Sequence, residues 1–95
     1  MEINELAKRQ WNWCEKMEWH NKLPLEYLAL IGSEVGECVN ECRGEEPTEH
    51  FKEELADVIM RCLDMSVAFG IDIEKEILKK MAHNEKNGKK PGRIK

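Results

Sequence analysis

Hydrophobic residues recur every three or four positions along four separate segments of the chain, which is the spacing of an amphipathic helix. The pattern predicts helices over about 4–17, 25–42, 49–69 and 73–84 or a little beyond. No segment shows the alternation of polar and apolar residues that is typical of a strand. The expected fold class is therefore all-α, with the second to fourth helices long enough to pack as a bundle.

Local signals support these helix boundaries. Pro24 suits the first turn of the second helix, Thr48 is the expected N-cap of the third helix, and Asp72 is the expected N-cap of the fourth. Gly70 should stop the third helix in a left-handed C-cap.

One apolar stripe on each helix is expected to form the core. The stripes are Ile3, Leu6, Ala7, Trp13, Cys14 and Met17; Leu25, Leu28, Gly32, Val35, Val39 and Cys42; Phe51, Leu55, Val58, Ile59, Cys62, Met65 and Phe69; and Ile73, Ile77, Leu78 and Met81. Gln10 interrupts the first stripe, which is unusual for a purely structural face. Gly32 and Gly36 each cost roughly 1 kcal/mol in a helix interior, and we expect them to admit a close helix or ligand.

Length and composition limit the class of protein. The 95 residues suit a single domain, 1–95, whose small core favours oligomerisation. No apolar run reaches the length of a transmembrane helix. The charged start "MEINELAKRQ" lacks the apolar centre of a signal peptide, so a cytoplasmic location and no membrane partner are expected.

Charge is unevenly distributed along the chain, whose net charge is −4. Residues 34–57 hold nine acids against two bases, which argues against a nucleic-acid partner. Residues 86–95 hold five bases and no acid and are expected to form a basic, mobile tail.

The four cysteines, Cys14, Cys38, Cys42 and Cys62, form no C-x-x-C pair. Cys38 and Cys42 lie one helical turn apart, a spacing that zinc ligands share. We favour the other interpretation, in which all four are small apolar residues of the core in a reducing compartment.

Carboxylates lie beside the apolar sequence of the second helix. At 100° per residue, Glu34, Glu37 and Glu41 share an arc of 60°. Leu30 and Tyr27 lie on the same arc one and two turns earlier, respectively. The arc is therefore not an ordinary solvated helix face.

A second pair, Glu54 and Asp57, lies at the edge of the apolar stripe of the third helix. If the two helices pack antiparallel, both pairs converge, and their mutual repulsion is relieved by a divalent cation. Oxygen ligands suit Mg²⁺, with Mn²⁺ as an alternative, and not zinc. The Glu-x-x-His motif of a di-iron bundle is absent from the sequence. The alternative for each acid is a solvated surface residue, with Asp57 paired to Arg61 one turn later.

The fourth helix carries Lys80 and Asn84 one turn apart. A cation and an amide at the border of the core suit a phosphate chain beside a metal ion.

These motifs resemble a known family. Glu34-x-x-Glu37, a gap of 16 residues and then Glu54-x-x-Asp57 resemble the E-x-x-E…E-x-x-D signature of the MazG-like all-α nucleoside triphosphate pyrophosphohydrolases. The contexts "LALIGSEVGE", "EELADVIM" and "GIDIEKEILKKMAHNEKN" are similar to the family as well, so the resemblance covers roughly residues 10–90.

The resemblance implies a four-helix MazG-like bundle that assembles as a dimer or a dimer of dimers. It implies Mg²⁺-dependent hydrolysis of nucleoside triphosphates, above all deoxynucleotides in a house-cleaning role, to the monophosphate and pyrophosphate. By position, Glu34, Glu37, Glu54 and Asp57 are the expected metal ligands and catalytic carboxylates. The expected phosphate-binding residues are Lys80 and Asn84. Trp19 falls where an aromatic ring stacks on the base, and Trp13 falls on a nearby aromatic position. Gln10, near a base- or phosphate-contacting position, and Arg61 complete the expected substrate-binding set.

Two positions depart from the family pattern. Many relatives have arginine where this chain has Asn87, and the dCTP-preferring relatives have an aromatic residue where it has Arg61. Both differences leave the base preference open. Two other functions also stay open: a phosphoribosyl-ATP pyrophosphohydrolase, against which the tryptophan-rich first helix argues, and a non-catalytic helical module for dimerisation or regulation. The absence of a readable Ser-His or Cys-His dyad argues against covalent catalysis.

Overall fold

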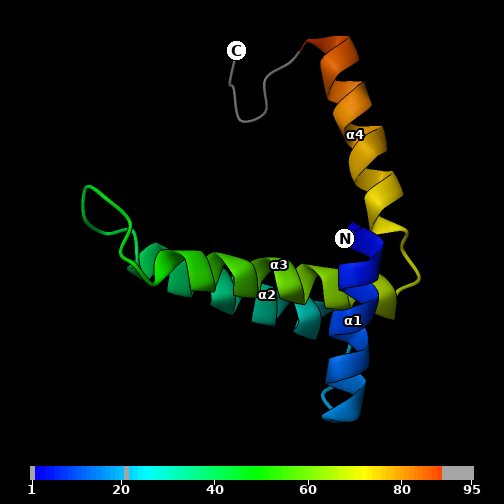
Figure 1. Ribbon diagram of the computed structural model, residues 1–95, viewed down its shortest axis with the longest axis horizontal. Coiled ribbons are helices and arrows are strands. Elements are labelled where there is room, and N and C mark those ends of the chain that lie inside the picture. Colours follow the sequence, from blue (N-terminus) through cyan, green and yellow to red (C-terminus); the bar gives the residue numbers. More distant parts are fainter. Residues whose placement is uncertain (1, 21, 89–95) are drawn as a thin grey trace.

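The computed structural model describes residues 2–20 and 22–88, which form four α-helices and no strand. Figure 1 shows α1 (Ile3–Lys16), α2 (Pro24–Asn40), α3 (Phe51–Ala68) and α4 (Ile73–Asn87). The all-α expectation is confirmed, and each helix lies within a few residues of its predicted range. None of these helices combines the length and the apolar character that crossing a membrane requires.

Most of the predicted helix ends are confirmed. Pro24 is the first residue of α2, and the side chain of Asp72 accepts a hydrogen bond from the Lys75 amide at 3.1 Å. Gly70, with φ of +65°, follows the end of α3 in the left-handed region that glycine tolerates.

The predicted N-cap Thr48 is wrong, because α3 begins later and His50 occupies the cap position. The Thr48 hydroxyl instead donates to the Glu41 carboxylate at the end of α2. The Thr48 amide also donates to the carbonyl oxygen of Glu41 at 2.9 Å. Thr48 therefore closes the connection between the two helices rather than starting the second of them.

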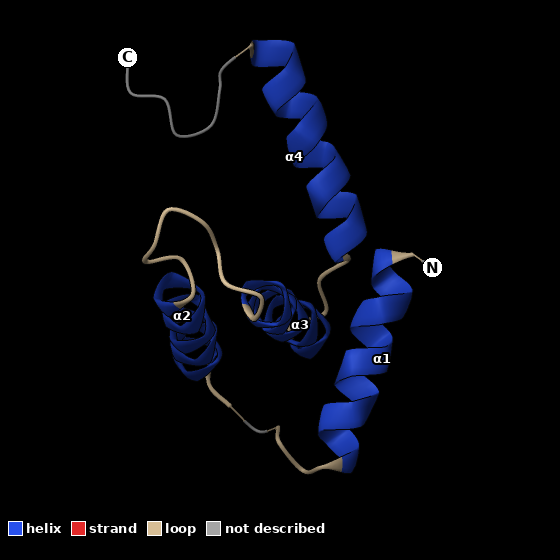
Figure 2. Ribbon diagram, turned by 60° about the vertical axis from the view of Figure 1, so that its left-hand side comes forward, coloured by secondary structure: helices blue, strands red, loops and turns tan. Residues whose placement is uncertain are grey.

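The α2 and α3 helices form an antiparallel hairpin, and α1 crosses the C-terminal part of α3 (Figures 1 and 2). At the start of α4, the side chain of Asn4 donates to Asp72 Oδ1 at 2.8 Å and accepts from the Glu74 amide at 3.2 Å. These bonds hold the start of α4 against the start of α1.

Beyond that point α4 projects away from the hairpin (Figure 1). Its main packing contacts are with α1. Within one chain, the second to fourth helices therefore do not close the compact bundle that the sequence led us to expect. The hydrogen bonds of Asn4 hold the first turn of α4 to α1, and the rest of α4 extends from that point.

The core of the single chain is small. The buried hydrophobic residues are Ala7, Cys14, Tyr27 and Leu63 among those described. The rings of Tyr27 and Phe69 meet edge to face, with centroids 5.6 Å apart. Two of the four cysteines, Cys42 and Cys62, are exposed, so the prediction that all four pack in the core is wrong for this pair in the single chain.

The prediction that the apolar stripe of α2 faces the core is also wrong within the single chain. This stripe faces away from α3: Leu25 is 76% exposed, and Leu28, Val35 and Val39 are exposed as well. The face that packs against α3 instead carries the buried Tyr27 and the half-buried Glu34. A side chain built at either Gly32 or Gly36 would meet no atom within 4 Å, so nothing in the described chain approaches these glycines closely.

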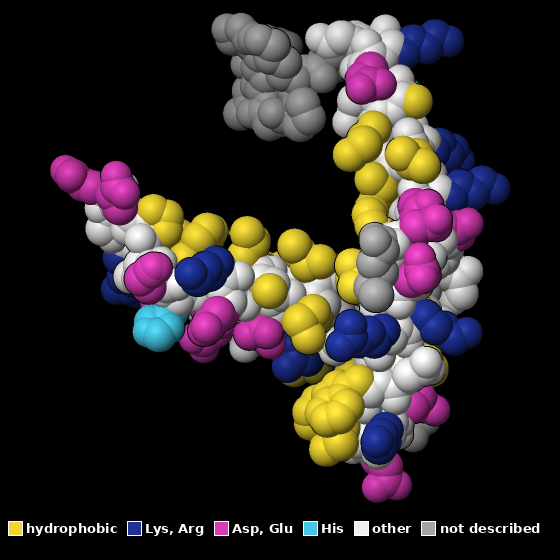
Figure 3. Space-filling model, in the orientation of Figure 1, with side chains coloured by type: hydrophobic (Ala, Val, Ile, Leu, Met, Phe, Trp, Pro, Cys, Tyr) yellow, Lys and Arg dark blue, Asp and Glu magenta, His cyan; other side chains and the backbone are white. Residues whose placement is uncertain are grey.

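The uncovered apolar side chains line the inner sides of the angle between the hairpin and α4 (Figure 3). Exposed apolar residues include Leu55 and Ile59 on α3 and Leu78 and Met81 on α4. Of the predicted basic tail, residues 86 and 87 belong to α4, and 89–95 lie outside the described residues.

Candidate active site

The hairpin brings carboxylates from both predicted pairs together. Glu34 on α2 and Glu54 and Asp57 on α3 each offer an oxygen within 4.8 Å of the others. Glu54 and Asp57 share one face because they lie three positions apart on a helix. The antiparallel course of α2 places Glu34 opposite them. We call these three residues the acid cluster.

Electrostatic strain in the acid cluster appears at Glu54. Desolvation raises the pKa of this carboxyl above its usual value, and the negative charges of Asp57, Glu37, Glu34 and Glu41 raise it further, in that order. The thiol of Cys38 lies beside the cluster, and its pKa is raised by desolvation first and then by the charge of Glu54. Both pKa shifts therefore reflect partial desolvation together with a local excess of negative charge.

Glu37 stands apart from its three predicted partners. Its side chain is exposed and does not join the close group of oxygens, although its charge acts on Glu54. The structure thus brings three of the four predicted metal ligands together and leaves Glu37 at the rim.

Arg61 brings a positive charge to the border of the acid cluster. Arg61 Nε donates to Glu34 Oε2 at 2.5 Å across the hairpin. The predicted pair between Arg61 and Asp57 on the same helix is not formed, because the guanidinium crosses to α2 instead. Arg61 therefore neutralises one carboxylate of the cluster and leaves the other two without an ion-pair partner among the described residues.

A cavity of about 560 Å³ opens beside the acid cluster, between α1, the following connection, α2 and α3. Six of the ten predicted site residues line it: Gln10, Trp13, Trp19, Glu34, Asp57 and Arg61. Its acidic end is formed by Glu34 and Asp57, and its aromatic end by the two tryptophans. This volume is within the usual range for small-molecule sites.

Trp13 is more exposed than the sequence led us to expect. Trp13 was assigned to the core stripe of the first helix, but it is 49% exposed, close to the 52% of Trp19. Both rings therefore present free surface at the cavity. Gln10, the polar residue within the apolar stripe, donates its amide to Cys14 Sγ at 3.5 Å.

The predicted phosphate-binding pair lies elsewhere. Lys80 and Asn84 border a separate shallow hollow on α4, together with Ile77 and Met81. Since α4 projects away from the hairpin, this pair does not join the acid cluster within one chain (Figure 1).

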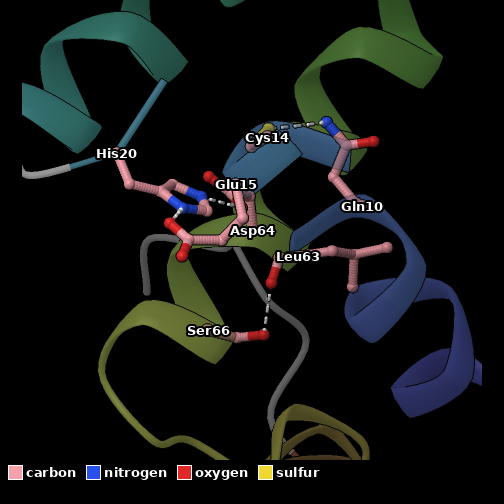
Figure 4. A network of polar contacts seen from close by, with 7 residues as sticks. All are labelled: Gln10, Cys14, Glu15, His20, Leu63, Asp64 and Ser66. Atoms are coloured by element: carbon pink, nitrogen blue, oxygen red, sulfur yellow. Dashed lines mark hydrogen bonds and ion pairs between the residues drawn. The ribbon is translucent and has the colours of Figure 1, made fainter. Parts of the chain in front are cut away.

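Sequence reasoning missed one buried polar group beside the cavity. The ring of His20 lies between the carboxylates of Glu15 and Asp64, as Figure 4 shows. The sequence did carry a signal for Asp64. It lies at position i+7 from Asp57, with Arg61 at i+4, so all three share one helix face and Asp64 lies on the same side as the site.

Comparisons with protein-family models, with curated proteins and with solved structures found no match for this chain.

Proposed function

We propose that the chain is a MazG-like, Mg²⁺-dependent nucleoside triphosphate pyrophosphohydrolase, which releases the monophosphate and pyrophosphate. The observation that carries the proposal is the convergence of Glu34, Glu54 and Asp57 within 4.8 Å, at one end of a cavity lined by Trp13 and Trp19. A triphosphate with a metal ion suits the acidic end, and a flat base suits the aromatic end.

The acid cluster fits a magnesium ion on chemical grounds. An octahedral Mg²⁺ with bonds of about 2.1 Å holds neighbouring oxygens roughly 3 Å apart and opposite ones about 4.2 Å apart. The separations within the cluster, all below 4.8 Å, need only small side-chain adjustments to meet this geometry. The pKa of Glu54 is raised by desolvation first and then by the neighbouring carboxylates, and a divalent cation would relieve the second of these effects.

The residues of the chain then have distinct tasks. Bound Mg²⁺ supplies polarisation of the α-phosphoryl group and charge neutralisation of the phosphates. A cluster carboxylate that does not engage the ion orients the attacking water and accepts its proton, and the pyrophosphate leaves from the opposite side of the phosphorus. Arg61, beside Glu34, contacts a phosphate oxygen. Trp19 stacks on the base, for which every nucleobase offers a flat face.

The phosphate-binding pair on α4 reaches the substrate in a second copy of the chain. In one chain, Lys80 and Asn84 lie away from the acid cluster, and the apolar sides of the angle between the hairpin and α4 are uncovered. Monomeric proteins rarely leave contiguous apolar surface of this kind exposed. We therefore propose a homodimer or homotetramer in which the apolar faces meet and Lys80 of one copy serves the cluster of another.

A non-catalytic helical dimerisation or regulatory module is the second candidate. The exposed apolar surface favours it as much as it favours an oligomeric enzyme, because assembly alone would cover Leu25, Val39 and Leu78. The acid cluster and the aromatic cavity have no task in such a module.

A pyrophosphate-release assay with a panel of nucleotides, with and without millimolar Mg²⁺, separates the two candidates. The enzyme proposal expects release that requires Mg²⁺ and that Asp57→Asn abolishes. Glu53→Gln, an exposed acid one residue from Glu54 but outside the cluster, is the matched control and should keep normal turnover. Equal activity of Asp57→Asn and the wild type would refute the assignment of the acid cluster.

A mixing experiment tests the contribution of the second copy. Neither Lys80→Ala nor Asp57→Asn should be active alone. When equal amounts are unfolded together and refolded, random dimers restore about one quarter of the wild-type activity, because half the dimers are mixed and each has one complete site. No recovery, from mixtures shown to be dimeric, would place Lys80 in the same chain as the cluster it serves.

A further inference from the structure

A second group of metal-ligand atoms lies at the α1 end of the cavity, outside the acid cluster. The thiol of Cys14, a ring nitrogen of His20 and a carboxylate oxygen of Asp64 lie within 4.8 Å of one another. They come from three elements: α1, the connection that follows it, and α3. All three residues also line the cavity, so the group is accessible from solvent.

The group is otherwise well shielded from water. The side chains of His20 and Asp64 are only 5% and 8% exposed, and Cys14 is buried. Three polar side chains that converge in a buried position carry a desolvation cost, which close partners or a bound cation must offset.

Three contacts fix the orientation of the His20 ring. Its Nδ1 faces a carboxylate oxygen of Glu15, and its Nε2 faces Asp64 Oδ1 at 3.0 Å (Figure 4). Its ring stacks on Trp11, with the centroids 3.7 Å apart. A carboxylate behind one ring nitrogen, with the other nitrogen directed at a second ligand, is the arrangement that orients histidines in metal sites.

We propose that Cys14, His20 and Asp64 form a site for a transition-metal ion of the Zn²⁺ class, with a fourth coordination position that faces the cavity. Thiolate, imidazole and carboxylate are the usual zinc ligands, whereas Mg²⁺ avoids sulfur and nitrogen. Zinc bonds of about 2.0–2.3 Å place tetrahedral ligands roughly 3.3–3.8 Å apart. The separation of 3.0 Å between His20 and Asp64 is close to this range.

Binding requires the loss of the Cys14 thiol proton and of the hydrogen that joins His20 Nε2 to Asp64 Oδ1, and it involves no redox step. The buried thiol of Cys14 is protonated in the metal-free chain, since burial and the charge of Asp64 raise its pKa. The ion displaces this proton to water as the metal–sulfur bond forms. Metal affinity is therefore coupled to proton release, as is usual for cysteine ligands.

Occupancy of this site would fasten the segment that carries Trp19. His20 is the next residue along the chain, and a bond from its ring to the ion ties the connection to both α1 and α3. The site thus fixes one wall of the cavity. The proposal is independent of the pyrophosphohydrolase function, because none of its ligands belongs to the acid cluster.

The test is a titration of the full, reduced chain with Co²⁺, in the presence of excess millimolar Mg²⁺ that saturates oxygen-only sites. The expected result is one equivalent of tightly bound cobalt with a thiolate-to-cobalt charge-transfer band. Cys14→Ser should abolish the band. Cys62→Ser removes an exposed thiol outside the group and should leave the band unchanged.

A second variant guards against a folding defect. Asp64→Asn keeps the size and the hydrogen bonding of the side chain, and it should weaken Co²⁺ binding by at least tenfold with unchanged helicity. One equivalent of Zn²⁺ should raise the Tm of the wild type and not that of Asp64→Asn. The absence of a thiolate band in the folded wild type, or its persistence in Cys14→Ser, would overturn the proposal and leave Glu15, His20 and Asp64 as an ion-pair network only.

Discussion

Arg61 is predicted to weaken metal binding while it assists the reaction, so its removal should move the two properties in opposite directions. The guanidinium Nε lies 2.5 Å from an oxygen of Glu34, which is one of the proposed Mg²⁺ ligands. Allowing about 2 Å for a metal–oxygen bond places the cation roughly 4–5 Å from this positive charge. Replacement by glutamine removes the repulsion and frees Glu34.

The size of the expected change in Mg²⁺ affinity depends on how exposed the two side chains are. The side chain of Arg61 is 41% exposed and that of Glu34 is 17% exposed, so a water-like dielectric is the appropriate lower limit for the interaction. A unit charge about 5 Å from a divalent cation costs roughly 1.7 kcal/mol in that limit. Arg61→Gln should therefore tighten Mg²⁺ binding by at least about 15-fold.

Isothermal titration calorimetry without nucleotide measures this change directly. Arg61→Lys keeps the positive charge and is the matched control, with an affinity expected to stay near that of the wild type. The gain in Arg61→Gln should shrink as salt is added, because part of the repulsion passes through solvent. The value of kcat/KM for the nucleotide should fall in the same variant, since a phosphate loses its partner. An unchanged or weaker Mg²⁺ affinity in Arg61→Gln would refute the reasoning.

Three further predictions rest on single residues. Folding raises the pKa of Glu54 above its ordinary value of 4.5, so metal-free stability falls as pH rises through the folded value. Glu54→Gln should therefore have the same Tm as the wild type near pH 4 and a higher Tm near pH 7. A Tm difference independent of pH would contradict this. Trp19→Ala should raise KM by about tenfold to a hundredfold, the worth of one base stack, with little change in Tm, and a lower Tm with unchanged KM would assign Trp19 to packing. Folding lowers the pKa of Asp72, through the hydrogen bond from the Asn4 side chain first and from the Lys75 amide second. The stability that Asp72 contributes is therefore complete above its ordinary pKa of 3.8 and is lost as the pH falls through its pKa in the folded chain. Asp72→Ala should lower the Tm at neutral pH and converge with the wild type in acid, and a gap that persists in acid would refute the cap.

The number and type of the helices were predictable from the sequence because each depends on local signals. The periods of apolar residues, Pro24, Gly70 and Asp72 act within one or two helical turns, so no knowledge of distant contacts was needed. Thr48 shows where such reasoning fails. Its hydroxyl accepts from the His50 amide at the start of α3, at 3.3 Å, and also donates to Glu41 at the end of α2, so Thr48 precedes the cap position and links the two helices.

The carboxylate arc was predictable for a similar reason. The positions of Glu34 and Glu41 on α2 follow from helix geometry, and their place beside Tyr27 indicated that this arc faces another helix. The partner of Arg61 was not predictable, because the choice between Asp57 on its own helix and Glu34 on α2 depends on the register of the hairpin. The network around His20 was missed because it joins three segments that are distant in sequence.

The largest discrepancy concerns the direction of the apolar faces, and it has a physical cause. Apolar periodicity identifies a face that avoids water, but it does not say whether the cover comes from the same chain or from another. On α2 the strongest stripe, with Leu25 and Val39, stays exposed while the weaker arc with Glu34 packs against α3. Hydrophobic burial within one chain would have favoured the opposite choice. The observed arrangement is understandable under the proposed assembly, since a second copy covers the stronger stripe. The carboxylates then remain on the inner side of the hairpin, beside the cavity, where a metal ion relieves their repulsion.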